Sequence, residues 1–280
     1  MGKKCRYQSP EKTQRMRNNN WSGGYKTILL FLSCFLLAFN NSDAQTAPFR
    51  LKIMSFNVCR SGELTGYSVG PFANLIRQYQ PDIIALQELD YKTTRNTGID
   101  FTTKLGAALG MFPVFGRTIY YKGGEYGIAV LSGFPYLSVK TEPLPSPAGT
   151  KEQRAVLITE IRLPSGQDIR FASTHLDYTN TEERQVQVEK LNGVLQAQAY
   201  PVIVAGDFNA WPDSKEISEG MSTWKTISNL EPTVPAKAPR NTIDYIFCYP
   251  KDKWRGQAAV SHSNIQLSDH LPISAVVELQ

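Results

Sequence analysis

The sequence predicts an α/β (α+β) domain in which two mostly antiparallel sheets pack together and helices flank them. From Phe49 onward, short apolar runs of strand length follow one another between turn residues. Only a few longer segments have apolar residues at helical spacing, so the predicted strands outnumber the helices. A parallel, doubly wound sheet is the rival arrangement, but it requires a regular alternation of strands and helices that this chain lacks.

Strands are predicted where β-branched, aromatic and aliphatic residues cluster between turn formers. In chain order, the predicted strands are residues 51–58, 82–88, 126–132, 154–163, 168–176, 201–209, 242–248 and 273–279. The second of them, DIIALQE, is almost wholly apolar at its centre, which indicates a buried strand. Pro164-Ser165-Gly166 has the composition of a hairpin turn and joins the fourth strand to the fifth.

Three helices are predicted between these strands. The first covers 71–80 and is opened by Pro71, because proline is favoured in the first turn of a helix. The second covers 100–109. The third begins at Asn180, which resembles a capping box together with Glu183, and it ends before Pro201. Its apolar positions keep roughly helical spacing: Val186, Leu191, Val194 and Leu195.

Residues 1–44 are predicted to be a cleaved signal peptide, and residues 45–280 a single domain. Lys26 leads into the uninterrupted apolar run 27–39, and the small residues of a cleavage site follow at Ser42 and Ala44. The run is short for a helix that spans a bilayer. A retained membrane anchor is the alternative. We therefore expect an exported protein, periplasmic or extracellular, with no stable membrane insertion after cleavage.

The basic character of the whole chain belongs mostly to this leader. The formal net charge is +5, but residues 1–44 contain seven of the 30 Lys and Arg and only two of the 25 Asp and Glu, which leaves 23 of each. A neutral domain lacks the broad basic surface of a sequence-indifferent nucleic-acid binder. Nucleic acid is therefore not the favoured partner. The two remaining cysteines, Cys59 and Cys248, are expected to be buried free thiols rather than a disulfide.

Polar side chains recur where the predicted strands end, and the ends of several strands in one sheet can form a single site. These residues are Asn57, Glu88, His175, Asp177, Asp207, Asn209, Asp244, Asp269 and His270. Asp207 and Asn209 lie on the same side of an extended segment. Carboxylates and amides suit magnesium, manganese or calcium, and histidines bind phosphate or move protons. Zinc fits less well, because no HxxxH or CxxC spacing is present.

Each of these residues also has a structural explanation when it is taken alone. Glu88 could be a solvated residue after a strand, and the two asparagines could be turn formers. His175 could be a hydrogen-bonded core histidine. Together, however, seven motifs occur in order over residues 51–273: SFNV, LQE, YGIAVLS, THLD, GDFNAWPDS, TIDYIF and LSDHLP. They resemble the endonuclease/exonuclease/phosphatase (deoxyribonuclease I-like) superfamily of metal-dependent phosphoesterases, which implies a four-layer αββα sandwich.

The resemblance also implies roles for the polar residues on the metal side of the site. Glu88 and Asn57 hold the main divalent ion, usually magnesium, and Asp269 helps to ligate or orient it. Manganese and calcium are the alternatives. Asp207 and Asn209 position the attacking water and the scissile phosphate. A metal-dependent hydrolase of phosphoester bonds follows from these roles.

The remaining implied roles concern the two histidines. Asp244 pairs with His270, and this pairing fixes the tautomer and raises the pKa of the imidazole. His175 faces the phosphate and is oriented by a carboxylate, for which Glu125 is the candidate. Arg154 either contacts the phosphate or faces solvent. The chain departs from many relatives at Gly133, where they have a basic residue after the LS of the middle strand.

The superfamily leaves the substrate open, because fold does not decide among phosphoesters. The predicted export and neutral charge favour a phosphodiesterase that acts on a small or lipid-derived phosphoester. We expect the protein to be a monomer. A secreted nuclease is the second candidate. A catalytically inactive binding module on the same fold is the third, and it would be expected to have lost site residues that this chain retains.

Overall fold

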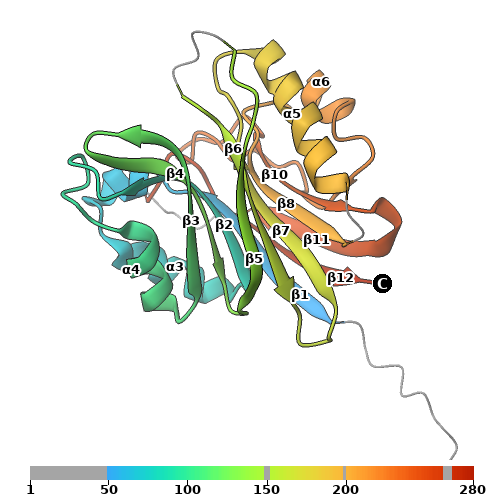
Figure 1. Ribbon diagram of the computed structural model, residues 1–280, viewed down its shortest axis with the longest axis horizontal. Helices are drawn as coiled ribbons and strands as arrows, with labels where there is room; N and C mark the ends of the chain where they lie inside the picture. The colour runs from blue at the N-terminus through green and yellow to red at the C-terminus, as the bar shows by residue number, and fades with distance from the viewer. Residues whose placement is uncertain (1–48, 148–151, 198–199, 261–266) are drawn as a thin grey trace, which may run out of the picture. The chain divides into compact units, whose positions relative to one another are not determined.

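Two six-stranded sheets pack face to face in the computed structural model of the chain (Figure 1). The structure describes residues 49–147, 152–197, 200–260 and 267–280, which belong to the compact unit Pro48–Gln280. The predicted signal peptide, residues 1–44, lies outside the described residues. The arrangement confirms the predicted fold class of two sheets with flanking helices.

The first sheet has the strand order β11-β12-β1-β2-β4-β3. Its strands are β1 (Arg50–Asn57), β2 (Ile83–Tyr91), β3 (Phe112–Tyr121), β4 (Gly124–Ser132), β11 (Trp254–Val260) and β12 (Ile273–Leu279). The second sheet has the order β5-β6-β7-β8-β10-β9. Its strands are β5 (Tyr136–Pro143), β6 (Ala155–Arg162), β7 (Asp168–His175), β8 (Val202–Asp207), β9 (Lys225–Thr226) and β10 (Asp244–Tyr249). Among the strands of the described residues, only β1–β2 and β7–β8 pair in parallel, one pair in each sheet.

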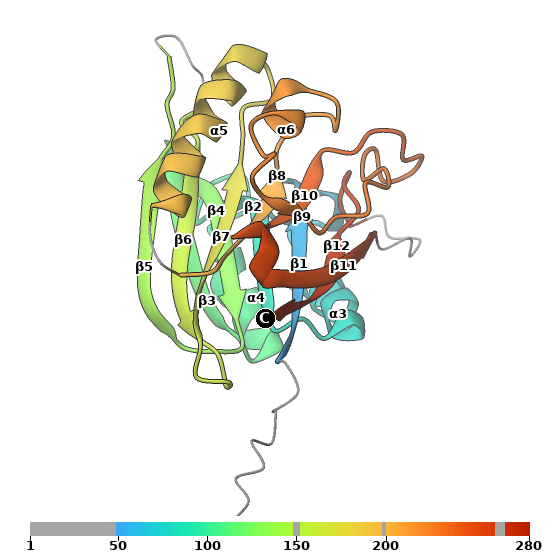
Figure 2. The same cartoon turned by 90° about the vertical axis from the view of Figure 1, so that its right-hand side faces the viewer.

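Helices cover the outer faces of both sheets, as Figures 1 and 2 show. On the first sheet these are α3 (Val69–Tyr79) and α4 (Phe101–Leu109), and on the second α5 (Thr181–Gln196) and α6 (Lys215–Ser218). The remaining helical turns are α2 (Cys59–Gly62), η1 (Glu63–Thr65) and η2 (Lys251–Lys253). Within the described part of the chain, no helix has the length and apolar character needed to cross a membrane.

Three apolar clusters hold the four layers together. The central cluster joins the facing sides of the sheets and includes Ile53, Val130 and Phe171. The other two pack each sheet against its helices. Cys59 and Cys248 are buried free thiols, as predicted, and burial raises the pKa of the Cys59 thiol to about 11. Both observations indicate structural cysteines rather than reactive ones.

The sequence failed to predict four strands, and all four lie at sheet edges. β3 and β11 are the outer strands of the first sheet, and β5 and β9 are the outer strands of the second. Most residues of β3 and β5 are at least partly exposed. An edge strand buries little of its surface, so its sequence lacks the continuous apolar run that identified the central strands.

The helices differ from their predictions in detail. α3 starts at Val69, two residues before Pro71, so the proline lies inside the first turn. Asn180 caps α5 as predicted, since its side chain accepts hydrogen bonds from the amides of Glu182 and Glu183. Val186, however, is 41% exposed. Val188 is buried against the second sheet in its place, because it lies on the same face of the helix as Leu191 and Leu195.

Gly206 in β8 allows the close parallel pairing with β7. A Cβ atom at this position would overlap the carbonyl oxygen of Thr174. We expect Gly206→Ala to lower the free energy of unfolding by about 3 kcal/mol or more, since overpacking a core is costly. Gly193 in α5 is the matched control, because a Cβ there meets nothing within 4 Å. Gly193→Ala should instead raise the free energy of unfolding by about 0.5 to 1 kcal/mol. Urea denaturation of both variants measures the two changes.

Candidate active site

The site lies at one edge of the two sheets, where the carboxyl ends of the parallel strands meet. β1 and β2 reach this edge from the first sheet, and β7 and β8 reach it from the second. In the second sheet His175 and Asp207 are register partners, and Asp207 is also paired with Asp244 of β10. Sheet pairing therefore aligns residues that are far apart in the sequence.

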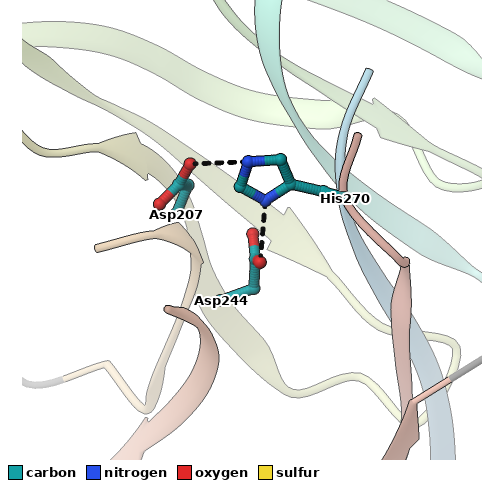
Figure 3. Close-up of side chains that lie close together, drawn as sticks. All are labelled: Asp207, Asp244 and His270. Carbon is teal, nitrogen blue, oxygen red and sulfur yellow. Dashed lines mark hydrogen bonds and ion pairs between the residues drawn. The ribbon is translucent and has the colours of Figure 1, made fainter. Parts of the chain in front are cut away.

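The Oδ2 atom of Asp207 is the centre of the polar cluster. It accepts a hydrogen bond from Asn57 Nδ2 at 3.0 Å. It lies 3.5 Å from Nε2 of His175 and 3.7 Å from Nε2 of His270 (Figure 3 shows the second contact). The Asp207 side chain is 1% exposed. One carboxylate oxygen thus faces both imidazoles and the first sheet.

Asp244 and His270 form the pair that the resemblance implies. His270 Nδ1 lies 2.9 Å from Asp244 Oδ2 (Figure 3). The hydroxyl of Thr233 donates to the same oxygen. With Nδ1 engaged in this way, Nε2 points toward Asp207. The Asp244 carboxylate thus orients the His270 ring and leaves the other nitrogen facing the centre of the site.

Charge and burial act differently on the two histidines. Burial opposes a charge on His270, but the carboxylates of Asp244 and Asp207 outweigh it and raise the pKa of His270 to about 10. Burial, the Arg154 guanidinium and His270 together hold the pKa of His175 well below its usual value. Burial and the nearby Asp244 raise the pKa of Asp207 to about 7, although His270 opposes the shift. At neutral pH the site therefore combines a charged and a neutral imidazole.

Replacing Asp244 should remove the charge from His270 at neutral pH. In Asp244→Asn the burial penalty stays while one carboxylate is lost, so the pKa of His270 should fall from about 10 to near or below 6.5. In the wild type, the raised pKa of His270 adds to the free energy of unfolding. This contribution is complete below pH 6.5 and disappears as the pH rises through about 10. NMR titration of the imidazole in metal-free protein checks the shift. The surface variant Asp168→Asn should leave it unchanged.

Glu88 reaches the site because β2 has an irregularity at this point. The register with β4 shifts between Leu86 and Leu89, and Glu88 has a φ of 61°. The strand continues to Tyr91 instead of ending at Glu88 as predicted. A bulge of this kind redirects a side chain. The Glu88 carboxylate then accepts hydrogen bonds from Asn57 Nδ2 at 3.1 Å and from the amide of Arg60 at 3.2 Å.

Asp269 lies on the irregular lead-in to β12. The Ser268 hydroxyl donates to the carbonyl oxygen of Asn57 at 2.6 Å, which ties this segment to the end of β1. Leu271 donates its amide to the carbonyl oxygen of Thr233. The backbone is therefore not extended here, and the adjacent side chains differ in environment: Asp269 is exposed, whereas His270 is buried. Asp269 and Glu88 line one pocket.

These oxygen donors fit a hard divalent ion. The carboxylates of Glu88 and Asp269, with the side-chain oxygen of Asn57, are the ligand types that magnesium, manganese and calcium prefer. In the described residues, one further group of candidate ligands lies close together, Asp207, Asp244 and His270. Its Asp244–His270 hydrogen bond already occupies one of these ligand atoms, so the Glu88 side is the better metal site.

Asn209 is close to Asp207, but the two side chains do not project from an extended strand. β8 ends at Asp207, and Asn209 has a φ of 49°. The amide of Asn209 donates to Asp207 Oδ1 at 2.9 Å, and its Nδ2 donates to the carbonyl oxygen of Leu176 at 3.0 Å. The prediction of an extended segment was wrong, because the asparagine adopts a left-handed turn that its side chain tolerates.

Glu125 has a different partner from His175, the one that the resemblance implies. Its carboxylate pairs with Arg117 Nη1 at 2.9 Å on the hairpin of β3 and β4, and the described contacts include none with His175. Arg154 lies instead on the His175 side, where it lowers the pKa of that histidine. The Arg154 side chain is 2% exposed rather than solvent-facing, and its Nη1 contacts Glu152 at 2.9 Å. Glu152, which pairs with Arg154 and lines the neighbouring pocket, was not predicted from the sequence.

A pocket of about 470 Å³ opens beside the metal-side carboxylates. It is lined by Arg60, Glu88, Arg95, Ile119, Tyr121, Tyr126, Glu152, Tyr178 and Asp269. Its two arginines and three tyrosines were not predicted from the sequence as site residues. The position of Arg60, three residues after Asn57, is the one sequence signal that could have indicated it.

The arrangement suits the hydrolysis of a phosphoester, because oxygen ligands, a buried carboxylate and two imidazoles surround the place that a phosphate would occupy. The fold and the site thus define a class of protein, the phosphoester hydrolases. A sequence profile of the Endonuclease/Exonuclease/phosphatase family matches residues 54–270, and the chain belongs to this family. Proteins of the family are phosphoester hydrolases and generally depend on a divalent metal ion.

Individual relatives are distant. Protein YbhP of Escherichia coli K12 is 26% identical over 258 residues, which cover 84% of this chain and 99% of YbhP. An endonuclease/exonuclease/phosphatase structure from Beutenbergia cavernae has a TM-score of 0.72 at 21% identity, over 82% of this chain and 72% of that one. The mannosyl-6-phosphatase Bt3783 of Bacteroides thetaiotaomicron has a TM-score of 0.66 at 18% identity, over 81% and 99%. At these identities, the solved structures show a shared fold.

Proposed function

We propose that the protein is an exported, magnesium-dependent phosphodiesterase that acts on a small or lipid-derived phosphoester. The observation that carries this proposal is the pocket of about 470 Å³, which places Glu88 and Asp269 on the wall of a cavity of small-molecule size. Pockets for small ligands have volumes of about 300 to 1,000 Å³. The equal numbers of acidic and basic residues after residue 44 also favour a small substrate over a nucleic acid.

Glu88, Asn57 and Asp269 are the residues that would hold the ion. Their side chains come from β2, from β1 and from the lead-in to β12, and hydrogen bonds from Asn57 Nδ2 and the Arg60 amide fix the Glu88 carboxylate. When bound, a divalent ion supplies a Lewis acid that stabilises the negative charge developing on the phosphate oxygens.

Asp207 is the base in this proposal. Its pKa of about 7 matches the requirement that a general base be close to the working pH. Its Oδ2 would accept the proton of the attacking water, while the amide of Asn209 orients the carboxylate through Oδ1. The hydrogen bond from Asn57 keeps Oδ2 directed toward the first sheet.

The two histidines would hold the phosphate in the protonation states that their surroundings impose. His270 is charged because Asp244 and Asp207 raise its pKa, so its Nε2–H donates a charge-assisted hydrogen bond. His175 is neutral because its pKa is lowered, and its Nε2 lies 3.5 Å from Asp207. Arg154, buried beside His175, would add positive charge on the same side.

A panel of substrates tests the activity. The mature domain should hydrolyse bis(p-nitrophenyl) phosphate with magnesium and lose this activity in EDTA. Plasmid and single-stranded DNA should be nicked slowly or not at all. Rapid nicking would instead favour the secreted nuclease, and metal-independent hydrolysis would contradict the assigned metal site.

Export is a separate part of the proposal and rests on the leader in residues 1–44. Expression of the full chain in a Gram-negative host should yield a protein in the periplasm whose amino terminus begins after Ala44. Full-length protein retained in the membrane fraction would support the anchor instead.

A further inference from the structure

The pocket beside Glu88 and Asp269 is lined by more charged and aromatic side chains than the proposed reaction uses. The reaction needs these two carboxylates, but the pocket is also lined by Arg60, Arg95 and three tyrosines. The part of the substrate next to the scissile phosphate would enter this space. The character of the lining therefore indicates what that part of the substrate is.

Arg60 enters the pocket from a strained turn. Cys59, Arg60 and Ser61 have φ values of 46°, 52° and 59° in succession, a conformation that L-residues rarely adopt. The turn is held by the Arg60 amide on Glu88 Oε2 at 3.2 Å and by the Gly62 amide on the carbonyl oxygen of Val58 at 2.8 Å. Backbone strain of this kind clusters at functional sites. Here it holds Arg60 beside a metal ligand.

The contacts of the Arg60 guanidinium are weak. Its Nη1 lies 3.0 Å from Glu63 Oε2, and these two side chains are 45% and 34% exposed, while its Nη2 donates a long hydrogen bond of 4.0 Å to Cys59 Sγ. Ion pairs this exposed contribute little to stability. A substrate anion in the pocket can therefore compete for the guanidinium or share it. The planar fork of arginine also matches a carboxylate or a phosphate with two parallel hydrogen bonds.

Arg95 has a different role in the same pocket. Its Nε and Nη2 donate to Asp90 at 3.2 and 3.1 Å, so its charge is matched by a buried carboxylate. Its guanidinium lies 4.7 Å from the ring centre of Tyr121 and 5.4 Å from that of Tyr126. Arg95 thus holds the two tyrosines as a wall of the pocket. Glu152 is likewise matched by Arg154.

We propose that this pocket recognises a second anionic group of the substrate and that Arg60 is the residue that binds it. The preferred substrate is then a small phosphoester with a carboxylate or a further phosphate next to the scissile phosphate. This assignment rests on the proposed phosphodiesterase function. Arg60 sets specificity, and the chemical step does not depend on it.

Matched p-nitrophenyl diesters test the assignment. The second ester group is carboxyethyl, the isosteric and neutral carbamoylethyl, or phosphoethyl. We expect the wild-type protein to have a kcat/KM on the order of ten- to a hundredfold higher for the two anionic esters than for the amide, mainly through KM. The ratio between the carboxylate and phosphate esters shows which anion the pocket prefers.

Arg60→Gln should reduce this preference to about twofold or less while its activity on the neutral amide stays close to that of the wild type. That unchanged activity also shows that the variant is folded. Arg162→Gln is the matched control, because Arg162 pairs with Asp168 on the second sheet and does not line the pocket. It should keep the full preference. Equal kcat/KM values for the amide and both anionic esters in the wild type would overturn the assignment.

Product binding separates failure of this assignment from failure of the proposed function. With magnesium present, calorimetric titration should show that carboxyethyl phosphate or phosphoethyl phosphate binds the wild type about tenfold or more tightly than carbamoylethyl phosphate, and that Arg60→Gln removes the difference. If all three diesters are hydrolysed but the anionic and neutral products bind equally well, the second-anion site alone is contradicted. If none of the diesters is hydrolysed, the proposed phosphodiesterase function is contradicted, and the second-anion site with it.

Discussion

Asp207→Asn is expected to lower kcat on a p-nitrophenyl phosphodiester by about a thousandfold or more, because the variant loses a general base. The amide keeps the shape of the side chain but cannot accept the proton of the attacking water. It also removes the negative charge that faces both imidazoles through Oδ2. The KM should change far less than kcat, since the substituted group acts on the water rather than on the bound ester.

The pH profile provides a second readout for this variant. In the wild type, the acidic limb of kcat/KM should reflect the titration of Asp207 near pH 7 in the free enzyme and rise with pH, since the base must be deprotonated. This limb should disappear in Asp207→Asn. Asp213→Asn, in the loop that follows, is a suitable control and should be close to wild type. A kcat within about tenfold of the wild-type value would remove Asp207 from the role of base.

Glu88→Gln should weaken magnesium binding by at least about a hundredfold, and activity at low metal concentration should be lost with it. Changes to groups that only support a metal ligand already cost about ten- to a hundredfold, and Glu88 is assigned as a direct ligand. The substitution also replaces one of the two Glu88 oxygens that accept hydrogen bonds from Asn57 Nδ2 and the Arg60 amide, so one of these two hydrogen bonds is lost. Calorimetric titration of metal-free protein with magnesium measures the effect, and excess magnesium should partly restore turnover.

Glu125→Gln is the matched control on the neighbouring strand. The Glu125 carboxylate pairs with Arg117 on a partly exposed hairpin, and such pairs contribute little. Magnesium affinity and kcat should therefore stay within about twofold of the wild-type values. A large loss of kcat in Glu125→Gln would restore the role that the resemblance gave this residue. Magnesium binding unchanged in Glu88→Gln would move the metal site to Asp207, Asp244 and His270.

The fold could be predicted from the sequence because its central strands are buried on both faces. β8 is largely a continuous apolar run, β2 begins with one, and β1 is buried from Ile53 onward. The edge strands β3 and β5 did not give this signal, since solvent covers much of their surface. Burial determines composition most strongly in the centre of a sheet and least at its edges.

The sequence by itself determined the chemistry of the site: which acids, amides and imidazoles follow the strands, and in which order along the chain. The tertiary structure decided how they are used. Packing of the two sheets against each other brings Asn57 Nδ2 within 3.0 Å of Asp207 Oδ2, 150 positions away, and a bulge turns Glu88 toward both Asn57 and Arg60. The tertiary structure also pairs Glu125 with Arg117 and Glu152 with Arg154. Local residue patterns carry burial and turn chemistry, whereas contacts between sheets depend on register and irregularities that form only when the whole core packs.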